Sequence, residues 1–239
     1  MINKQVRSVA DALEGIRDGS VVMIGGFGSV GQPDAIIEGL IEQGARNLTL
    51  IANNAGSGHV GLAKLLNAGR VSRIICSYPR SSGSVVFEAL FQAGKLDLEI
   101  VPQGTLAERI RAAGAGIPAF YTPTTVGTIL AKGKEHREFN GRTYVLEEAL
   151  PADVALVEAW TADQFGNCVY RESGRNFNAI MATAAKLTIV QACNMTEAGT
   201  LDPEAIVTPG LFVQRIVHVP ERTLLTDSSA SAETRKQAA

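Results

Sequence analysis

The sequence predicts an α/β protein with an open, doubly wound and mainly parallel sheet, helices on both of its faces, and a hairpin-containing second half. Three observations lead to this prediction. Short apolar runs alternate with amphipathic helical patterns through the first half, as expected of strand–helix–strand units. The strand segments are continuously apolar, which is typical of parallel strands covered on both faces. An Asn140-Gly141 pair between two strand-like runs indicates a tight hairpin turn of type I′.

The elements of the first half follow in order. Ser8 stands at the spacing of a helix cap before Ala12 and Leu13, so a helix begins there. Four strands then alternate with four helices. We expect the strands near residues 20–24, 47–52, 71–76 and 97–101, and the helices near residues 33–43, 60–68, 84–93 and 104–113. In a sheet of this kind, ligands bind at the carboxyl ends of the strands.

The second half of the chain has a different pattern. After a hairpin at residues 138–146, the expected elements are strands at 154–159 and 168–170 around a turn at 163–167, a helix near 176–185 and a strand near 187–192. We see no repeat and no linker. We therefore expect one domain over residues 1–226, followed by a small, polar and disordered tail over residues 227–239.

Composition limits the possible functions. The chain has 239 residues, 46% of them hydrophobic, which supports a sizeable core. A formal net charge of −2 gives no electrostatic case for nucleic acid. The three cysteines and three histidines are scattered, so no metal site is expected. We expect the cysteines to be buried thiols in a reducing compartment. The N-terminus lacks the apolar core of a signal peptide and no apolar run reaches membrane-spanning length, so we expect a cytoplasmic protein without membrane contact.

A glycine-rich segment is the most informative part of the sequence. It follows an apolar strand-like run and precedes a helical pattern that Pro33 opens, and its residues are Gly25, Gly26, Phe27, Gly28, Ser29, Val30 and Gly31. Glycine lets the backbone approach a ligand closely, and free N–H groups at a helix N-terminus face negative charge. The segment therefore predicts a binding site for an anion.

Two other interpretations of this segment stay open at this point. Its Gly26, Gly28 and Gly31 match the G-x-G-x-x-G fingerprint of a dinucleotide site. That site also needs an acidic residue at the end of the next strand, where this chain has Asn53-Asn54. The segment can equally be a tight turn without a ligand.

A second polar corner follows the strand expected at 97–101. It is Pro102-Gln103-Gly104, and a helix begins directly after it. Gln103 therefore stands at the carboxyl end of a strand with an amide that can donate to an oxyanion during acyl transfer. The alternative is that Gln103 caps the helix or meets water. Arg109 and Arg111 on the same helix are typical of a solvated face.

A third corner, with Asn53, Asn54 and Gly56, follows the strand expected at 47–52. Paired amides with a glycine can bind a carboxylate or carbonyl, and they can also make an ordinary Asx turn. Because all three corners follow parallel strands, we expect them to converge on one crevice.

The sequence shows no nucleophile for acyl transfer. It has no G-x-S-x-G motif, and no cysteine has an evident histidine partner. The glutamates Glu108, Glu158, Glu172 and Glu197 stand outside the glycine-rich corners. The pattern is that of a binding half whose nucleophile comes from another chain.

Several segments together form a family signature. They are Asp18–Pro33, Asn53–Gly56, Pro102–Arg111, Gly114–Gly116, Ala119–Pro123, Gly166-Asn167, Tyr170-Arg171, Arg175–Asn178 and Leu201–Gly210. In this order and with few gaps, nearly to Pro220, they resemble the first of the two subunits of the family I coenzyme A transferases. The likeness covers almost the whole chain, and the motifs are specific in combination.

The resemblance implies an enzyme that moves coenzyme A from an acyl-CoA, typically succinyl-CoA, to a 3-oxo acid through glutamyl intermediates. In two-subunit members the catalytic glutamate lies in a Ser-Glu-Asn-Gly motif of the second subunit, and this sequence has no such motif. The resemblance assigns coenzyme A binding to Gly25–Gly31 and an oxyanion-hole donor to Gln103. It implies coenzyme A as a substrate without any permanently bound cofactor. It also implies a heterodimer or A2B2 heterotetramer with that second CoA-transferase subunit, with the active site between the two kinds of chain.

The acceptor acid is indicated by the segment Ser77–Phe87, which is closer to the 3-oxoadipate branch than to the acetoacetate branch. 3-Oxoadipate carries a second carboxylate, and Arg80 is a candidate to bind it. The alternative for Arg80 is an ordinary surface arginine. Acetoacetate or another short-chain acid is the alternative acceptor, and an NAD-dependent oxidoreductase or a sugar-phosphate-binding module is a more distant alternative function.

Overall fold

The computed structural model of the chain describes residues 2–81 and 83–220. Among these residues, eight strands form one sheet with the order β11-β10-β8-β1-β2-β3-β4, and β9 pairs with β8. All neighbours along this path are parallel, whereas β9 is antiparallel to β8. The predicted class, an open and mainly parallel α/β sheet, is confirmed. The domain end at 226 and the tail at 227–239 lie outside the described residues.

The first half folds as its sequence pattern predicts. Its strands are β1 (Val21–Ile24), β2 (Leu48–Ile51), β3 (Val71–Cys76) and β4 (Asp97–Ile100). Its helices are α1 (Val9–Ala12), α2 (Asp34–Gln43), α3 (Gly61–Asn67), α4 (Val85–Gln92) and α5 (Gln103–Gly114). Ser8 caps α1 as expected, because its hydroxyl accepts a hydrogen bond from the Asp11 N–H at 3.1 Å.

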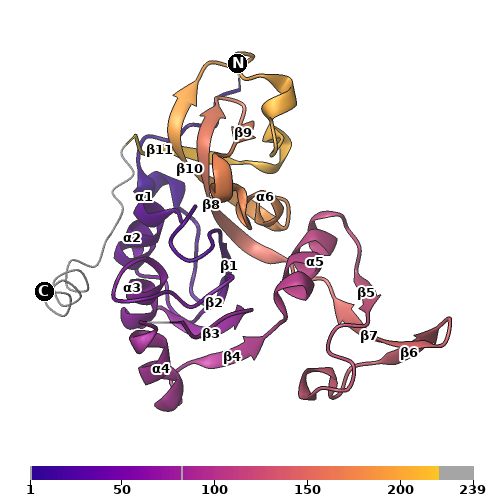
Figure 1. Ribbon diagram of the computed structural model, residues 1–239. Helices are drawn as coiled ribbons and strands as arrows, with labels where there is room; N and C mark the ends of the chain where they lie inside the picture. The colour runs from indigo at the N-terminus through magenta and orange to yellow at the C-terminus, as the bar shows by residue number, and fades with distance from the viewer. Residues whose placement is uncertain (1, 82, 221–239) are drawn as a thin grey trace, which may run out of the picture.

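Helices cover both faces of the sheet (Figure 1). α1 to α4 lie on one face, and α5 and α6 (Asn178–Met181) lie on the other. The core is divided in the same way. Val22 and Ile24 of β1 pack with Leu40 of α2, whereas Met23 between them packs with Ile110 of α5 on the opposite face. Because successive side chains of a strand point to opposite faces, a sheet covered twice needs the continuously apolar strands seen in the sequence.

Two strands of the second half, those expected at 154–159 and 187–192, are longer than expected. The elements of this half are β8 (Ala152–Asp163), β9 (Cys168–Val169), β10 (Ala185–Thr196) and β11 (Arg215–His218), with 3-10 turns at Glu172–Arg175, Pro203–Ala205 and Gly210–Phe212. The helix predicted at 176–185 is wrong in length, since only α6 forms. β10 begins at Ala185, where it pairs with β8, so the chain has to leave the helix before that residue. β11 was not predicted from the sequence.

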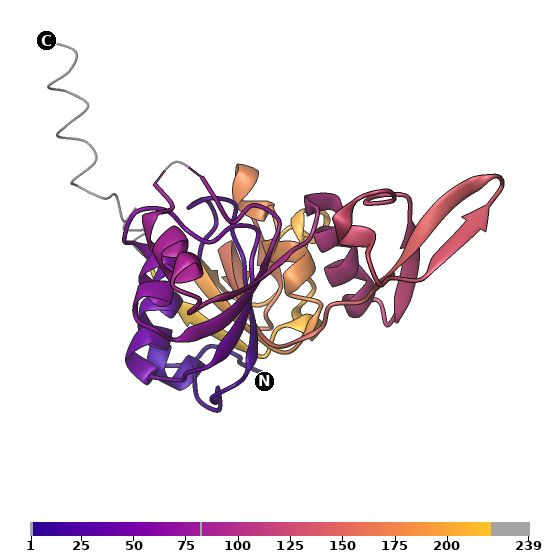
Figure 2. The ribbon, with the colours of Figure 1, turned by 90° about the horizontal axis from the view of Figure 1, so that it is seen from below.

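Residues 119–148 form a small arm that projects from the body of the molecule (Figure 2). Its antiparallel sheet has the order β5-β7-β6, with β5 (Ala119–Thr122), β6 (His136–Phe139) and β7 (Arg142–Glu148), and a 3-10 turn lies at Ile129–Ala131. The predicted hairpin joins β6 to β7. Asn140 and Gly141 have φ values of 51° and 76°, as a type I′ turn requires. β5 is a further strand that was not predicted.

Candidate active site

Two of the three predicted corners meet at the carboxyl edge of the sheet. The side-chain amide of Gln103, which follows β4, donates to Asn53 Oδ1 at 2.9 Å. Asn53 follows β2, and the hydroxyl of Ser77, which follows β3 between them, donates to the same oxygen at 2.6 Å. The carboxyl ends of three neighbouring parallel strands thus form one hydrogen-bonded group.

Gln103 is the first residue of α5 and is exposed. A glutamine amide nitrogen carries two hydrogens. One of them is given to Asn53, and this bond fixes the plane of the Gln103 amide. Because the side chain is exposed, the second hydrogen can be reached by a ligand at this edge of the sheet. The geometry therefore suits a donor that is held in place before a substrate arrives.

Asn53 lies behind Gln103 and is only 3% exposed. Its backbone oxygen accepts hydrogen bonds from the N–H groups of Ser77 and Tyr78 at 3.2 and 3.0 Å. Asn54 makes the Asx turn that was the alternative for this corner, since its Oδ1 accepts from the Gly56 N–H at 2.8 Å. The corner is therefore built mainly from internal bonds that support Gln103.

The glycine-rich segment forms a tight turn at the same edge. The backbone groups of Phe27 and Val30 exchange hydrogen bonds at 3.0 and 3.1 Å, and Gly28 between them has a φ of 62°. The side chains of Phe27 and Val30 are both exposed. The turn therefore presents an apolar tip at this edge of the sheet.

The expectation of free N–H groups at the start of α2 is wrong. The N–H groups of Ala35 and Ile36 donate to Gln191 Oε1 at 3.0 and 3.3 Å, and that of Asp34 donates to the Gln32 oxygen at 2.9 Å. Gln191 lies on β10, far away in sequence, so the local pattern could not reveal it. Any ligand of the glycine-rich segment must therefore be held by the turn and its surroundings.

Two asparagines of the second half support this turn, and neither was assigned a role from the sequence. Asn176 accepts a hydrogen bond from the Gly26 N–H at 3.1 Å, and Asn178 donates to the Gly31 oxygen at 2.8 Å. A Cβ on Gly25 would lie 1.8 Å from Asn178 Oδ1, and one on Gly31 would lie 2.8 Å from Asn178 Nδ2. These two positions are therefore glycine because another part of the chain approaches them closely. The Arg175–Asn178 motif was the available signal.

A cavity of about 220 Å³ opens beside this turn. It lies between Val30 and the extension of β8 beyond the end of β1, and its lining residues are Val30, Glu158, Trp160, Tyr170, Arg171, Glu172, Ser173 and Gly174. The Arg171 guanidinium lies 4.7 Å from the centre of the Trp160 ring. Burial raises the pKa of Tyr170 above its usual range, so its hydroxyl stays protonated and bonds to Thr208 at 2.7 Å.

Arg80 lies in the loop after β3 and is highly exposed. Its Nε donates to Glu88 Oε1 of α4 at 2.7 Å. Isolated exposed pairs of this kind contribute little to stability, so the guanidinium can exchange this partner for a ligand carboxylate at small cost.

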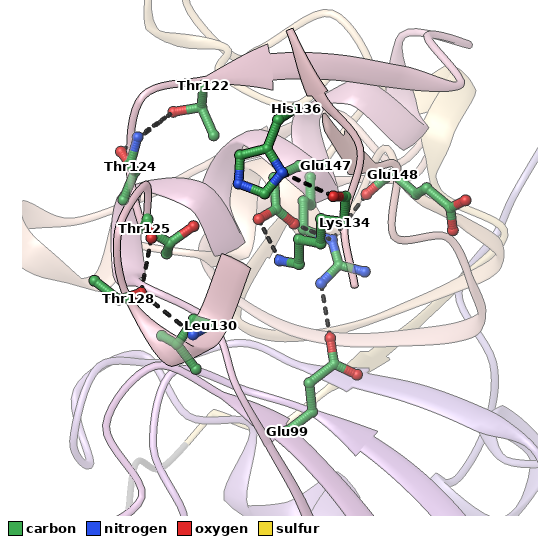
Figure 3. A network of polar contacts seen from close by, with 11 residues as sticks. Glu99, Thr122, Thr124, Thr125, Thr128, Leu130, Lys134, His136, Glu147 and Glu148 are labelled. Carbon is green, nitrogen blue, oxygen red and sulfur yellow. Dashed lines mark hydrogen bonds and ion pairs between the residues drawn. The ribbon is translucent and has the colours of Figure 1, made fainter. Parts of the chain in front are cut away.

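Arg109 differs from the solvated residue that its helix pattern suggested. Its side chain is only 12% exposed, and it donates to Glu99 Oε1 at 2.8 Å and to the Glu148 backbone oxygen at 2.8 Å. Lys134 pairs with the buried Glu147 beside it (Figure 3). Burial raises the pKa of Glu99, but hydrogen bonds and charge from Arg109 and Arg73 outweigh this, and the net pKa lies below its usual range. The network joins the arm to the body.

Within residues 2–81 and 83–220, no three His, Cys, Asp or Glu side chains gather as metal ligands would. In the same part of the chain, no helix is long and apolar enough to cross a membrane.

Comparison with known proteins gives consistent matches. The sequence model of the coenzyme A transferase family matches residues 6–219. One subunit of the 3-oxoadipate CoA-transferase of Pseudomonas putida is 58% identical over 92% of this chain and 95% of its own length. The corresponding subunit of a probable succinyl-CoA:3-ketoacid coenzyme A transferase of Bacillus subtilis is 49% identical over 90% of each chain.

A solved structure shares the fold. The acyl-CoA transferase of E. coli O157:H7, in a thioester complex with CoA, aligns with a TM-score of 0.84 at 22% identity. The alignment covers 95% of this chain and 51% of that chain, so this chain spans about half the length of that transferase. At such identity the match concerns the fold alone.

Proposed function

Because the chain belongs to the coenzyme A transferase family, we propose that it is one of two kinds of subunit in an enzyme that moves coenzyme A from succinyl-CoA to a 3-oxo acid. The observation that carries this proposal is the Gln103 amide, held by Asn53 at the carboxyl edge of the sheet. The sequence contains no Ser-Glu-Asn-Gly motif, so the catalytic glutamate is assigned to a partner subunit. The proposed assembly is a heterodimer or an A2B2 heterotetramer.

In the proposed reaction, the glutamate carboxylate of the partner subunit first attacks the thioester carbonyl of succinyl-CoA. The C–S bond breaks, leaving an acyl-glutamyl anhydride and coenzyme A thiolate. The thiolate attacks the glutamyl carbonyl and releases succinate. The 3-oxo acid carboxylate then attacks the glutamyl thioester, and the thiolate finally takes the 3-oxoacyl group and frees the glutamate. Each attack places negative charge on a carbonyl oxygen, and the second hydrogen of the Gln103 amide is proposed to stabilise it.

The proposed coenzyme A site is the glycine-rich segment from Gly25 to Gly31, whose exposed turn lies beside the cavity. Asn54 and Gly56 are proposed to line the substrate crevice, with Asn53 holding Gln103. No separate cofactor enters the proposed reaction, since coenzyme A is itself a substrate.

The test of the Gln103 role is Gln103→Ala in the assembled complex of both subunits. We expect kcat to fall by about 10²–10³-fold with the fold intact, as removal of one oxyanion donor does elsewhere. Gln92→Ala is the matched control, because Gln92 is also exposed but ends α4, away from the crevice. An unchanged rate for Gln103→Ala would show that this residue only begins a helix. Transfer by this chain alone would contradict the shared site.

The proposed acceptor is 3-oxoadipate, supported by the likeness to the Pseudomonas putida protein. Assay of the complex with succinyl-CoA against a panel of 3-oxo acids tests this, with acetoacetate as the main competitor. If Arg80 binds the distal carboxylate, Arg80→Ala raises KM for 3-oxoadipate and leaves KM for acetoacetate unchanged. Arg111→Ala is the control, because Arg111 is also exposed and paired with a glutamate. Equal changes for both acids would remove Arg80 from the site.

A further inference from the structure

We propose that Asn176 is a positioning residue that sets the shape of the glycine-rich turn and thereby the affinity for coenzyme A thioesters. This inference rests on the proposed function, in which that turn binds coenzyme A. It assigns a role in ligand binding to the segment between β9 and α6, which lies about 150 residues further along the chain than the turn.

Asn176 spans the turn with a single carboxamide. Its Oδ1 accepts hydrogen bonds from the Gly26 N–H at 3.1 Å and from its neighbour Phe177 at 2.7 Å. Its Nδ2 donates to the Val30 oxygen at 3.0 Å and to the Ser173 oxygen at 2.8 Å. Asn178 Nδ2 donates to the Oδ1 of Asn176 over a longer 3.4 Å. A carboxamide has two donor hydrogens and an oxygen with two lone pairs, so the hydrogen-bonding capacity of this side chain is fully used. Gly26 lies before the turn and Val30 within it, so Asn176 fixes the separation of its two sides.

The chain around Asn176 is itself held in a defined shape. Glu172 has a φ of 48°, a left-handed conformation that is unfavourable for a residue with a Cβ. Such strain persists only where surrounding contacts enforce it, and it is found mainly at functional sites. Here the Gly174 N–H donates to the Arg171 oxygen at 3.0 Å, and the Gly174 oxygen accepts from Asn178 Nδ2 at 2.9 Å. The segment therefore has a fixed conformation from which Asn176 can hold the glycine-rich turn.

The supported turn and its support line the same cavity. Val30 of the turn and four residues of the support are among the residues around the 220 Å³ space, the four being Arg171, Glu172, Ser173 and Gly174. Asn176 joins these two parts of the lining through its bonds to Val30 and Ser173. A change at Asn176 therefore alters the width of the cavity and the position of the exposed turn together.

This support is separate from the oxyanion donor. Gln103 is held by Asn53, and Asn53 is held by Ser77, through hydrogen bonds in which Asn176 takes no part. Loss of Asn176 should therefore weaken binding of the thioester while leaving the chemical step nearly unchanged. The loss of a residue that acts only on overall stability would not raise KM while leaving kcat nearly unchanged.

The experiment uses Asn176→Ala in the complex with the partner subunit. We expect KM for succinyl-CoA to rise about tenfold, the factor that corresponds to about 1.4 kcal/mol, with kcat changed less than about twofold. Hydrogen exchange of the amides at 26–30 should quicken by about tenfold or more. Asn176→Asp keeps the acceptor for Gly26 and loses the donor to Val30, so we expect an intermediate rise in KM. Asn3→Ala is the control, since it removes one bond from an exposed asparagine away from the cavity, the bond that Asn3 Oδ1 accepts from the Gln5 N–H at 3.0 Å.

The outcomes separate this inference from the function on which it rests. If the wild-type complex transfers coenzyme A but Asn176→Ala changes neither KM nor the exchange of the turn, the inference is wrong and the proposed function stands. A fall in kcat at constant KM also contradicts a positioning role. If the wild-type complex shows no transfer of coenzyme A, the proposed function fails. Hydrogen exchange then tests the role of Asn176 independently, because unchanged exchange of the amides at 26–30 in Asn176→Asp would show that Asn176 does not hold the turn. Should Asn176→Ala not fold, the Asp variant alone decides.

Discussion

Asn178 is expected to be one of the largest single contributors to the stability of this chain. It is fully buried, and it makes three bonds of 2.8 to 2.9 Å: to the oxygens of Gly31 and Gly174, and from the N–H of Glu158. Asn178→Ala would remove the partner of two buried backbone groups, the Gly31 oxygen and the Glu158 N–H, and of the half-buried Gly174 oxygen. Each such group costs about 1–3 kcal/mol. Allowing for water entering the vacated space, we expect a loss of about 3–5 kcal/mol in the free energy of unfolding.

The assay is urea unfolding followed by far-UV circular dichroism, with the shift in midpoint converted through a common m-value. Asn194→Ala serves as the control and should cost less than about 1 kcal/mol, because its one side-chain bond is exposed. Asn178→Asp keeps the acceptor for the Glu158 N–H but turns an oxygen toward two carbonyl oxygens. We expect it to be as unstable as Asn178→Ala. A loss below about 1 kcal/mol for Asn178→Ala would refute the reasoning, since it would mean that these backbone groups find other hydrogen-bond partners in the variant.

Two further predictions concern other parts of the molecule. Lys134→Met removes the nearer of the two cations paired with the buried Glu147, leaving Arg109 at 4.0 Å, and should lower the free energy of unfolding by about 2 kcal/mol. Lys186→Met, which breaks an exposed pair, should change it by less than about 1 kcal/mol; equal losses in urea melts would contradict a special role for the buried pair. Burial raises the pKa of Cys76 and Cys168 to about 12. These thiols stay protonated at neutral pH, so native protein should not react with a disulfide reagent that labels them after unfolding.

The elements that the sequence predicted well are those whose information is local. β1 to β4 are apolar runs bounded by polar corners, and α2 to α5 carry a clear helical period, so each was placed within a residue or two. The Asn140-Gly141 turn was equally local, since the pair itself favours the required backbone angles. α6 was predicted too long, because β10 begins at Ala185, where it pairs with a distant strand that the local pattern does not reveal.

In the candidate site, too, the features that depend on local sequence were predicted and those that depend on contacts across the fold were not. Parallel strands and their polar corners were enough to predict that Gln103 and the Asn53 corner approach one another, because carboxyl ends of parallel strands share an edge. The sequence could not say that Asn53 would hold Gln103, since that depends on which side-chain atoms meet. Arg109 was wrongly predicted to be solvated, because the acceptor groups around it come from β4 and the arm, which the pattern of its own helix does not show.

The glycine-rich segment was identified from its residues alone, as were the strand before it, the helix after it and the family to which it points. Why Gly25 and Gly31 must be glycine was decided only by the tertiary structure, where Asn178 occupies the space that a Cβ would need. The same holds for the start of α2, where Gln191 takes the N–H groups that the local pattern left for a ligand. Local patterns determine which groups a segment offers, whereas hydrogen bonds and close contacts across the fold determine which of those groups remain available.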